Sequence, residues 1–224
     1  MIGTIVLLCV IGAIVLLDKL AIGEFSISQP IIACPLIGLI FGEFHIGLLL
    51  GGVLQLVWVG ALPLGAKEPM DSQGAGVVAI ATFILAKKSV IDFNLEKVLF
   101  VGLFFGVLAS IVGQVGAQML KTYNNRLFKR IDKDSSIKRI VVNNYLGIIT
   151  SFIKNLVVIL IFQVLLVAVA PAIKLLPSFY LGELIVIPLA IGVASLAKII
   201  IFKRRILYMA IGALTGVLLW VILR

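Results

Sequence analysis

Charged residues are scarce in this sequence: they make up 13% of its 224 residues, whereas a soluble domain carries about a quarter. Hydrophobic residues account for 62%, and the mean hydropathy is +1.26. Several apolar runs approach the roughly 20 residues that a helix needs to cross a bilayer. The runs are apolar on every face and rich in glycine, and they lack the alternation of a transmembrane barrel strand. We therefore predict an all-α integral membrane protein.

Cysteine and histidine are nearly absent, with two of the former and one of the latter. Cys9 and Cys34 lie inside apolar runs, which favours packing over a disulfide or a metal site. His45 ends a short apolar run and suits a membrane boundary better than a phosphorylation site. No spacing fits zinc, and no phosphate-binding loop or Ser/His/Asp set can be assembled. We predict no catalytic residue, no metal and no cofactor, and a membrane enzyme using Asp71 or His45 is the weakest hypothesis.

Acidic residues are also few, ten against nineteen basic ones, which gives a formal net charge of +9. Such a balance can indicate nucleic acid binding, but here the basic residues are placed as in a membrane topology. Seven lie within residues 121–142 and three at 203–205, so we predict that both segments are cytoplasmic. The apolar stretches 144–170 and 180–202 return the chain to the side it left. The basic segments suit anionic lipid or a soluble partner, and we expect no nucleic acid partner.

The apolar segments differ in length. Ile2 to Leu17 is marginal, whereas residues 31–42 and 77–86 offer about 15–18 Å of helix, too little to cross a bilayer. Two short pieces flanking a long helix indicate re-entrant or broken helices, which in transporters point to the binding site. Ordinary helices with loose boundaries are the alternative. Five segments are long enough to cross: 46–66, 98–120, 144–170, 180–202 and 206–223.

Small and polar residues recur at four-residue steps and indicate dense helix packing. Small residues let helix backbones approach closely within lipid, and glutamines can bond across the contact. The helix predicted over 98–120 carries one such stripe, and three glycine pairs repeat the spacing. These residues are Gly102, Gly106, Ser110, Gln114 and Gln118 in the stripe, and the pairs Gly38/Gly42, Gly47/Gly51 and Gly212/Gly216.

The pattern of residues 65–76, Gly-Ala-Lys-Glu-Pro-Met-Asp-Ser-Gln-Gly-Ala-Gly, has no second copy in the chain, and no low-complexity linker is present. We therefore predict a single membrane transport domain over residues 1–224. Within it, residues 1–97 form a core segment with the substrate site, residues 121–142 form a basic cytoplasmic loop that can be partly helical, and residues 143–224 form the C-terminal helices.

A polar interruption at residues 65–76 stands between two strongly apolar stretches. It contains Lys67, Glu68 and Asp71. A charged side chain at the bilayer centre costs about 2.5–3.5 kcal/mol, so it faces water, a partner charge or a substrate. In the headgroup region that cost vanishes. Lys67 and Glu68 can pair with each other, with Asp71 or with water, and we predict that the functional site lies here.

Gln55 lies in the middle of an apolar span, where an amide without partners costs free energy. An amide donates and accepts together, which suits the vicinal hydroxyls of a sugar, and Asp71 can accept from two neighbouring hydroxyls. Trp58 shares the helix face of Gln55 and can stack on a sugar ring, although tryptophan is equally a membrane-interface residue. We predict Gln55, Asp71 and Trp58 as substrate ligands, together with Lys67 and Glu68.

Three further charged residues lie inside apolar segments. Lys154 and Lys198 lie within a few residues of the expected cytoplasmic side, so we predict that their ammonium groups extend to it as anchors. Glu183 lies near the outer end of its segment, and the sequence does not decide whether it pairs with another charge or faces water.

Three motifs carry a family resemblance: Gln29-Pro-Ile-Ile-Ala-Cys-Pro-Leu-Ile-Gly-Leu-Ile-Phe-Gly-Glu43, Gly51-Gly-Val-Leu-Gln-Leu-Val-Trp-Val-Gly60 and Gly65-Ala-Lys-Glu-Pro-Met-Asp71. Through them the chain resembles subunit IIC of the mannose/fructose/sorbose phosphotransferase systems. The resemblance is strong across residues 25–86 and continues in colinear order through the remaining helices and the basic loop.

The resemblance implies a sugar-translocating subunit in the bacterial inner membrane, crossing it several times. It implies a membrane partner, subunit IID, and soluble IIA and IIB carriers that deliver phosphate to the incoming sugar. It further implies helical hairpins, an elevator-type core that moves against a scaffold, and a trimer of IIC–IID pairs. The chain would then bind a hexose or amino-hexose near Gln55, Lys67 and Asp71, without a phosphoryl-acceptor residue of its own.

Two departures from the family pattern support an alternative. The position of Gln55 is often a carboxylate in relatives, and the region after Tyr180 lacks their Ala-Gly-Gly run and offers only Gly182 and Gly192. The alternative is a divergent or orphan membrane subunit with a structural or regulatory role and no sugar binding.

Overall fold

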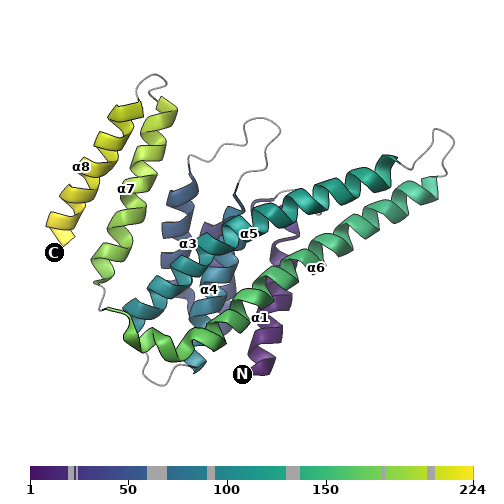
Figure 1. Ribbon diagram of the computed structural model, residues 1–224, viewed down its shortest axis with the longest axis horizontal. Helices are drawn as coiled ribbons and strands as arrows, with labels where there is room; N and C mark the ends of the chain where they lie inside the picture. The colour runs from purple at the N-terminus through teal and green to yellow at the C-terminus, as the bar shows by residue number, and fades with distance from the viewer. Residues whose placement is uncertain are drawn as a thin grey trace.

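The computed structural model describes residues 1–19, 23, 25–59, 70–89, 94–129, 137–177, 180–200 and 205–223. This part of the chain folds into helices and contains no strand, which confirms the all-α prediction (Figure 1). The elements are α1 (Ile2–Val15), α2 (Pro30–Phe41), α3 (Phe44–Trp58), α4 (Ser72–Ser89), α5 (Leu95–Lys129), α6 (Ile137–Val169), the 3₁₀ helix η2 (Ala170–Leu175), α7 (Leu181–Ile200) and α8 (Arg205–Leu223).

Helices α2 and α3 form a tight hairpin. Pro30 begins α2, where its missing N–H costs nothing, and Gly42 ends it in the left-handed conformation with φ of 79°. A Cβ on Gly47 of α3 would lie 2.4 Å from the carbonyl oxygen of Cys34, and one on Gly51 would lie 2.4 Å from that of Pro30. The glycine spacing therefore brings the two backbones into contact, as predicted.

The predicted crossing helix over residues 46–66 is wrong. Helix α3 ends at Trp58, and residues 60–69 lie outside the described part of the chain. With 12 and 15 residues, α2 and α3 are about 18 and 22 Å long, short of the roughly 30 Å of a bilayer core. The short piece predicted over residues 31–42 is present as α2, but the segment that follows it, α3, is short as well and pairs with α2.

Helix α4 is the centre of the molecule. Every residue from Gln73 to Ala86 is buried, and the helix packs against α1, α2, α3, α5 and α6. It begins at Ser72, so the prediction of a short piece over residues 77–86 was wrong at its N-terminal end. The composition of its first turns, with several glycines and alanines, predicted a polar loop. In the structure these small residues are helical, and their size allows neighbouring helices to approach on all sides.

Helices α5 and α6 are the longest elements, with 35 and 33 residues. They lie side by side and extend past the other helices as an arm (Figure 1). Both ends of the predicted basic loop are helical, since α5 continues to Lys129 and α6 begins at Ile137, while residues 130–136 lie outside the described part. The two glycines of the predicted stripe pack on α4: a Cβ on Gly106 would lie 2.9 Å from the Ala75 carbonyl oxygen and one on Gly102 would lie 3.1 Å from that of Ala79. Gln118, at the other end of the stripe, is exposed.

Helices α7 and α8 form a second hairpin at the side of the bundle (Figure 1). A Cβ on Gly212 would lie 2.8 Å from the Cβ of Ala194, which confirms close packing there. Helix α7 reaches the rest of the protein through α3, where Leu56 contacts Gly192. Large apolar side chains are exposed on the outward faces of α6 and α8, among them Val164, Ile161, Leu214, Val217 and Val221.

Candidate functional site

Asp71 caps the N-terminus of the central helix α4. Its Oδ1 accepts a hydrogen bond of 3.2 Å from the Gly74 backbone N–H, and its carbonyl oxygen accepts the first helical bond, from Ala75, at 3.0 Å. Its own N–H donates to the Ser110 carbonyl oxygen of α5 at 3.1 Å. Asp71 is 7% exposed, so a carboxylate lies at the start of α4 inside the bundle.

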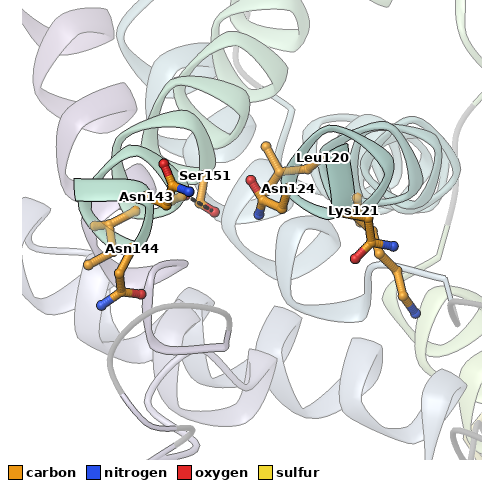
Figure 2. Close-up of a pocket in the computed structure, with 10 residues that line it drawn as sticks. Leu120, Lys121, Asn124, Asn143, Asn144 and Ser151 are labelled. Atoms are coloured by element: carbon orange, nitrogen blue, oxygen red, sulfur yellow. Dashed lines mark hydrogen bonds between the residues drawn. The ribbon is translucent and has the colours of Figure 1, made fainter. Parts of the chain in front are cut away.

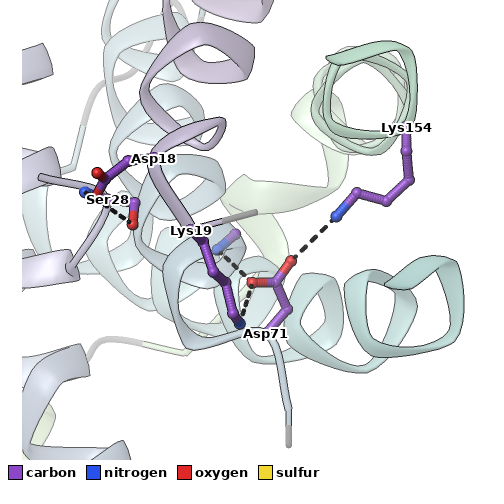
Figure 3. Close-up of polar contacts among 6 residues, drawn as sticks. Asp18, Lys19, Ser28, Asp71 and Lys154 are labelled. Carbon is purple, nitrogen blue, oxygen red and sulfur yellow. Dashed lines mark hydrogen bonds and ion pairs between the residues drawn. The ribbon is translucent and has the colours of Figure 1, made fainter. Parts of the chain in front are cut away.

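Two lysines approach this carboxylate from different helices (Figure 3). The Lys19 ammonium, in the segment after α1, lies 3.8 Å from Asp71 Oδ1, and the Lys154 ammonium of α6 lies 3.6 Å from Oδ2. The exposed fractions of the side chains are 26% for Lys19, 13% for Lys154 and 10% for Asp71. Charges enclosed this far persist because they are paired, so the triad ties α1, α4 and α6 together.

The prediction that Lys154 is a membrane anchor is wrong. Its ammonium turns inward to Asp71 instead of extending to the basic side, because an enclosed carboxylate attracts it more strongly than the boundary does. The sequence carried a signal for this, since a lysine well inside an apolar run is by default a functional candidate. Lys198 lies in α7, and its side chain is outside the described part of the structure. Glu183 lies in the first turn of α7, where Oε2 accepts a hydrogen bond of 3.4 Å from the Tyr180 N–H.

A second buried carboxylate holds the segment that carries Lys19. Asp18 accepts hydrogen bonds from the Ser28 N–H at 3.1 Å and the Ser28 hydroxyl at 3.2 Å (Figure 3). It also accepts one of 2.7 Å from the Phe25 N–H. These bonds join the end of α1 to the residues before α2. Asp18 therefore has a structural role, and sequence reasoning missed both it and Lys19 because no pattern linked them to Asp71.

Two glycines of α5 leave room for the triad. A Cβ on Gly113 would lie 2.5 Å from Asp71 Oδ2 and 2.8 Å from Asp71 Cβ, and one on Gly116 would lie 3.0 Å from Lys154 Cδ. Any larger residue at these positions would displace the charged groups. At these two positions α5 therefore leaves space for Asp71 and Lys154, because glycine has no side chain that could collide with them.

Several buried polar atoms have no hydrogen-bond partner among the described residues. Gln73 Oε1 lies two positions from Asp71, and Asn155 Nδ2 is next to Lys154; both side chains belong to residues at most 4% exposed. Gln163, fully buried on α6, has neither amide atom paired. An unmade hydrogen bond of this kind costs about 1–3 kcal/mol, so these amides are candidates to bind a polar solute.

The other predicted ligands have different outcomes. Gln55 lies half-buried on α3 with Oε1 buried and unpaired among described residues, and no hydrogen bond or ion pair joins it to Asp71. Trp58 packs partly against the hydrophobic core at the end of α3. Lys67 and Glu68 lie outside the described residues. Within the described ranges no group of three or more residues suits a metal ion.

The described helices include two stretches, Leu95–Leu127 and Ile140–Leu175, that are long and apolar enough to cross a bilayer. With the exposed apolar faces and the enclosed charged triad, they define an all-helical protein of the membrane-integral class. A family model described as the sorbose-specific IIC component of the phosphotransferase system matches residues 2–222. The chain belongs to this family, which confirms the resemblance carried by the three motifs.

Individual relatives match over shorter stretches. The chain is 35% identical over 82 residues to the sorbose-specific EIIC component of Klebsiella pneumoniae, which is 37% of this chain and 29% of that protein. It is 29% identical over 82 residues to the mannose-specific EIIC component of Escherichia coli K12, again 37% and 29%. It is 25% identical over 171 residues to the fructose permease IIC component of Bacillus subtilis, 75% of this chain and 60% of the relative. In each case the match spans less than two thirds of the relative's own length.

A solved structure described as that of a membrane protein has the same fold. It superposes with a TM-score of 0.71 over 91% of this chain and 81% of the other, at 16% sequence identity. At that identity the similarity establishes the helical arrangement alone.

Proposed function

We propose that this chain is the sugar-translocating membrane subunit of a phosphoenolpyruvate-dependent phosphotransferase system, carrying a hexose or amino-hexose. The observation that carries the proposal is the enclosed Asp71 carboxylate between Lys19 and Lys154. A carboxylate accepts from two hydroxyls, ammonium groups donate to hydroxyl or ring oxygens, and the nearby amides of Gln73 and Asn155 do both. Such a set matches the dense hydroxyls of a sugar.

Gln55 stays a predicted ligand, supported by its buried and unpaired amide oxygen. Lys67, Glu68 and Trp58 stay predictions as well, and the packing of Trp58 against the core favours a structural role for it. We add Lys19 and Lys154 to the proposed site. The short α2–α3 hairpin beside α4 supports an elevator-type core made from residues 1–97 within one transport domain.

The proposed partners follow from the family. They are the membrane subunit IID, the soluble carriers IIA and IIB, and a trimer of IIC–IID pairs in the bacterial inner membrane. The carriers would phosphorylate the sugar as it enters and so retain it. The basic segment at the end of the α5–α6 arm supports a cytoplasmic location for that end, where soluble partners and anionic lipid are available.

The first test is thermal unfolding of the purified assembly, with subunit IID co-expressed, against a panel of hexoses and amino-hexoses. A cognate sugar at about a hundred times its dissociation constant should stabilise the protein by about 2.7 kcal/mol. A sugar alcohol of equal osmolarity is the control for non-specific stabilisation. A flat response to every sugar would contradict the proposal and favour a structural or regulatory subunit.

The second test replaces Gly113 with alanine. The added methyl group would overlap the Asp71 carboxylate and its Cβ, so the carboxylate and the start of α4 must shift away from α5. We expect the affinity for the cognate sugar to fall about tenfold, or about 1.4 kcal/mol, while helix propensity at the position improves. Isothermal titration of the sugar and the unfolding midpoint are the two measurements. Unchanged affinity in a folded Gly113→Ala variant would remove Asp71 from the site.

A further inference from the structure

A separate cavity of about 350 Å³ lies between the outer halves of α5 and α6 (Figure 2). Asn124 of α5 and Ser151 of α6 face each other across it, while Lys121 and Asn144 extend to one side (Figure 2). Four of the lining residues are asparagines. The lining consists of Ala117, Leu120, Lys121, Asn124, Asn125, Asn143, Asn144, Gly147, Ile148 and Ser151.

The cavity lies within the last turns of the apolar stretch Leu95–Leu127 and the first turns of the stretch Ile140–Leu175. On α5 it begins where the apolar run 98–120 ends, and on α6 it covers the start of the run 144–170. Tyr123 and Tyr145, 46% and 62% exposed, stand on the two helices at this level. Exposed tyrosines mark the headgroup region of membrane helices, so the cavity opens among lipid headgroups.

The electrostatic surroundings favour an anion. Residues 121–142 contain seven basic residues and two acidic ones. The described arm residues around the cavity, 117–127 and 140–151, include Lys121 and Arg126 and no acidic residue. Lys121 is the basic residue of the cavity lining, and basic pockets between transmembrane helices on the cytoplasmic side bind anionic headgroups.

The amides add selectivity for hydroxyl groups. Asn124 Oδ1 is buried and has no hydrogen-bond partner among the described residues. Asn143 donates a long bond of 3.5 Å to the Leu127 carbonyl oxygen, which leaves its own Oδ1 available as an acceptor. Asparagine amides both donate to phosphate oxygens and accept from hydroxyls. The lining therefore suits a ligand that carries a phosphate and hydroxyls together.

Apolar side chains continue from the cavity along the outside of both helices. They are large exposed residues on the membrane-facing side of the turns that line the cavity and of the adjacent turns: Val112, Val115, Met119, Leu146, Ile149 and Ile153. Acyl chains can lie against such a surface while a headgroup occupies the cavity.

We propose that the cavity between α5 and α6 binds the headgroup of an anionic glycerophospholipid that carries hydroxyls, of the phosphatidylglycerol type. The phosphate lies toward the basic end of the arm and accepts from Asn side chains and Lys121, and the glycerol hydroxyls donate to Asn124 Oδ1. The bound lipid links α5 to α6 at the level of the Asn143–Leu127 bond. The lining does not include Asp71, Lys19 or Lys154, although Ser151 lies one helical turn from Lys154.

The test measures lipid binding to the full chain with its membrane partner, delipidated in a neutral detergent. Phosphatidylglycerol, phosphatidylcholine and soluble glycerol 3-phosphate are added in separate titrations, followed by native mass spectrometry and thermal unfolding. We expect phosphatidylglycerol to bind at least fivefold more tightly than phosphatidylcholine, and glycerol 3-phosphate to bind more weakly than the lipid. Equal binding of the two lipids would overturn the proposal, and so would glycerol 3-phosphate or a hexose binding as tightly as the lipid.

The variant Asn124→Leu separates a ligand role from a structural one. Because Asn124 Oδ1 lacks a partner among described residues, leucine should leave the unfolding midpoint in detergent unchanged or higher. Its affinity for phosphatidylglycerol should fall at least fivefold. Gln118→Leu, an exposed position on α5 outside the cavity lining, is the matched control and should bind as wild type does. Unchanged lipid affinity in Asn124→Leu, or an equal loss in Gln118→Leu, would overturn the assignment.

Discussion

Replacing Asp71 with asparagine is expected to abolish sugar uptake while the assembled complex persists. The change removes the carboxylate that lies 3.8 Å from the Lys19 ammonium and 3.6 Å from that of Lys154. Two hydrogen bonds from sugar hydroxyls to a charged acceptor are together worth about 3–6 kcal/mol, so affinity should fall about a hundredfold or more. Radiolabelled sugar uptake and co-purification of subunit IID are the measurements.

The ion pairs make a second variant necessary. Asp71→Asn leaves two enclosed ammonium groups without their counter-charge, and breaking such a pair costs about 3–5 kcal/mol when it is fully buried. The double variant Asp71→Asn with Lys154→Met removes one of these charges and restores the original net charge of the triad. Recovery of uptake in the double variant would mean that Asp71 serves only to hold Lys154, and would remove it as a sugar ligand.

Asp18 provides the matched control for Asp71. It is the other strongly buried aspartate among the described residues, at 5% exposed, and its carboxylate accepts from backbone and hydroxyl groups of Phe25 and Ser28 instead of lysines. Asp18→Asn should lower the unfolding midpoint and reduce sugar affinity far less than Asp71→Asn does, because Asp18 reaches the proposed site only through the segment that carries Lys19. Equal loss of affinity in Asp18→Asn and Asp71→Asn would show that Asp71 acts by holding the surrounding segments in place, and would remove it as a sugar ligand.

Replacing Gly47 with alanine is expected to disrupt the α2–α3 hairpin. The new Cβ would lie 2.4 Å from the carbonyl oxygen of Cys34 and 2.8 Å from the Cα of Pro35, and both neighbours are backbone atoms that cannot rotate away. The two helices must separate, and we expect the free energy of unfolding to fall by about 3 kcal/mol, the upper end for overpacking. Thermal unfolding in detergent measures the change.

Gly52→Ala is the control for Gly47→Ala. Gly52 lies on the same helix, but a Cβ there meets nothing within 4 Å. Alanine should therefore leave the free energy of unfolding unchanged or raise it by up to about 1 kcal/mol through helix propensity. If Gly47→Ala were as stable as Gly52→Ala, the close contact between α2 and α3 would be refuted.

The predictions made from the sequence differ in success for identifiable reasons. Glycine at four-residue spacing correctly indicated close helix contacts, because such spacing repeats one face of a helix whatever lies opposite. The boundaries over 46–66 and 77–86 were wrong, because hydropathy sums over a window and cannot detect that α3 ends at Trp58 or that α4 begins at Ser72. The prediction that residues 121–142 can be partly helical agrees with the structure, in which α5 continues to Lys129 and α6 begins at Ile137, but composition could not give these bounds.

The candidate site was predicted in part. Asp71 was identified because a carboxylate beside long apolar runs demands an explanation, and it lies where α1, α4, α5 and α6 meet. Lys154 was assigned to the membrane boundary, because it lies only a few residues from the expected cytoplasmic side. A lysine at that distance usually extends its ammonium group to water. Lys19 was not considered. It follows a short apolar run, and no local sequence pattern indicates that this segment approaches Asp71.

By itself the sequence determined the class of protein and the family, and it singled out Asp71 as a candidate ligand. Each of these depends on composition or on residues close together in the chain, which are the same whatever the fold. The tertiary structure alone decided which charges meet Asp71, that α4 lies at the centre, and that four asparagines of α5 and α6 line one cavity. These facts join residues far apart in sequence, and the attraction between enclosed charges and the close approach of glycine-lined helices act only once the helices have packed.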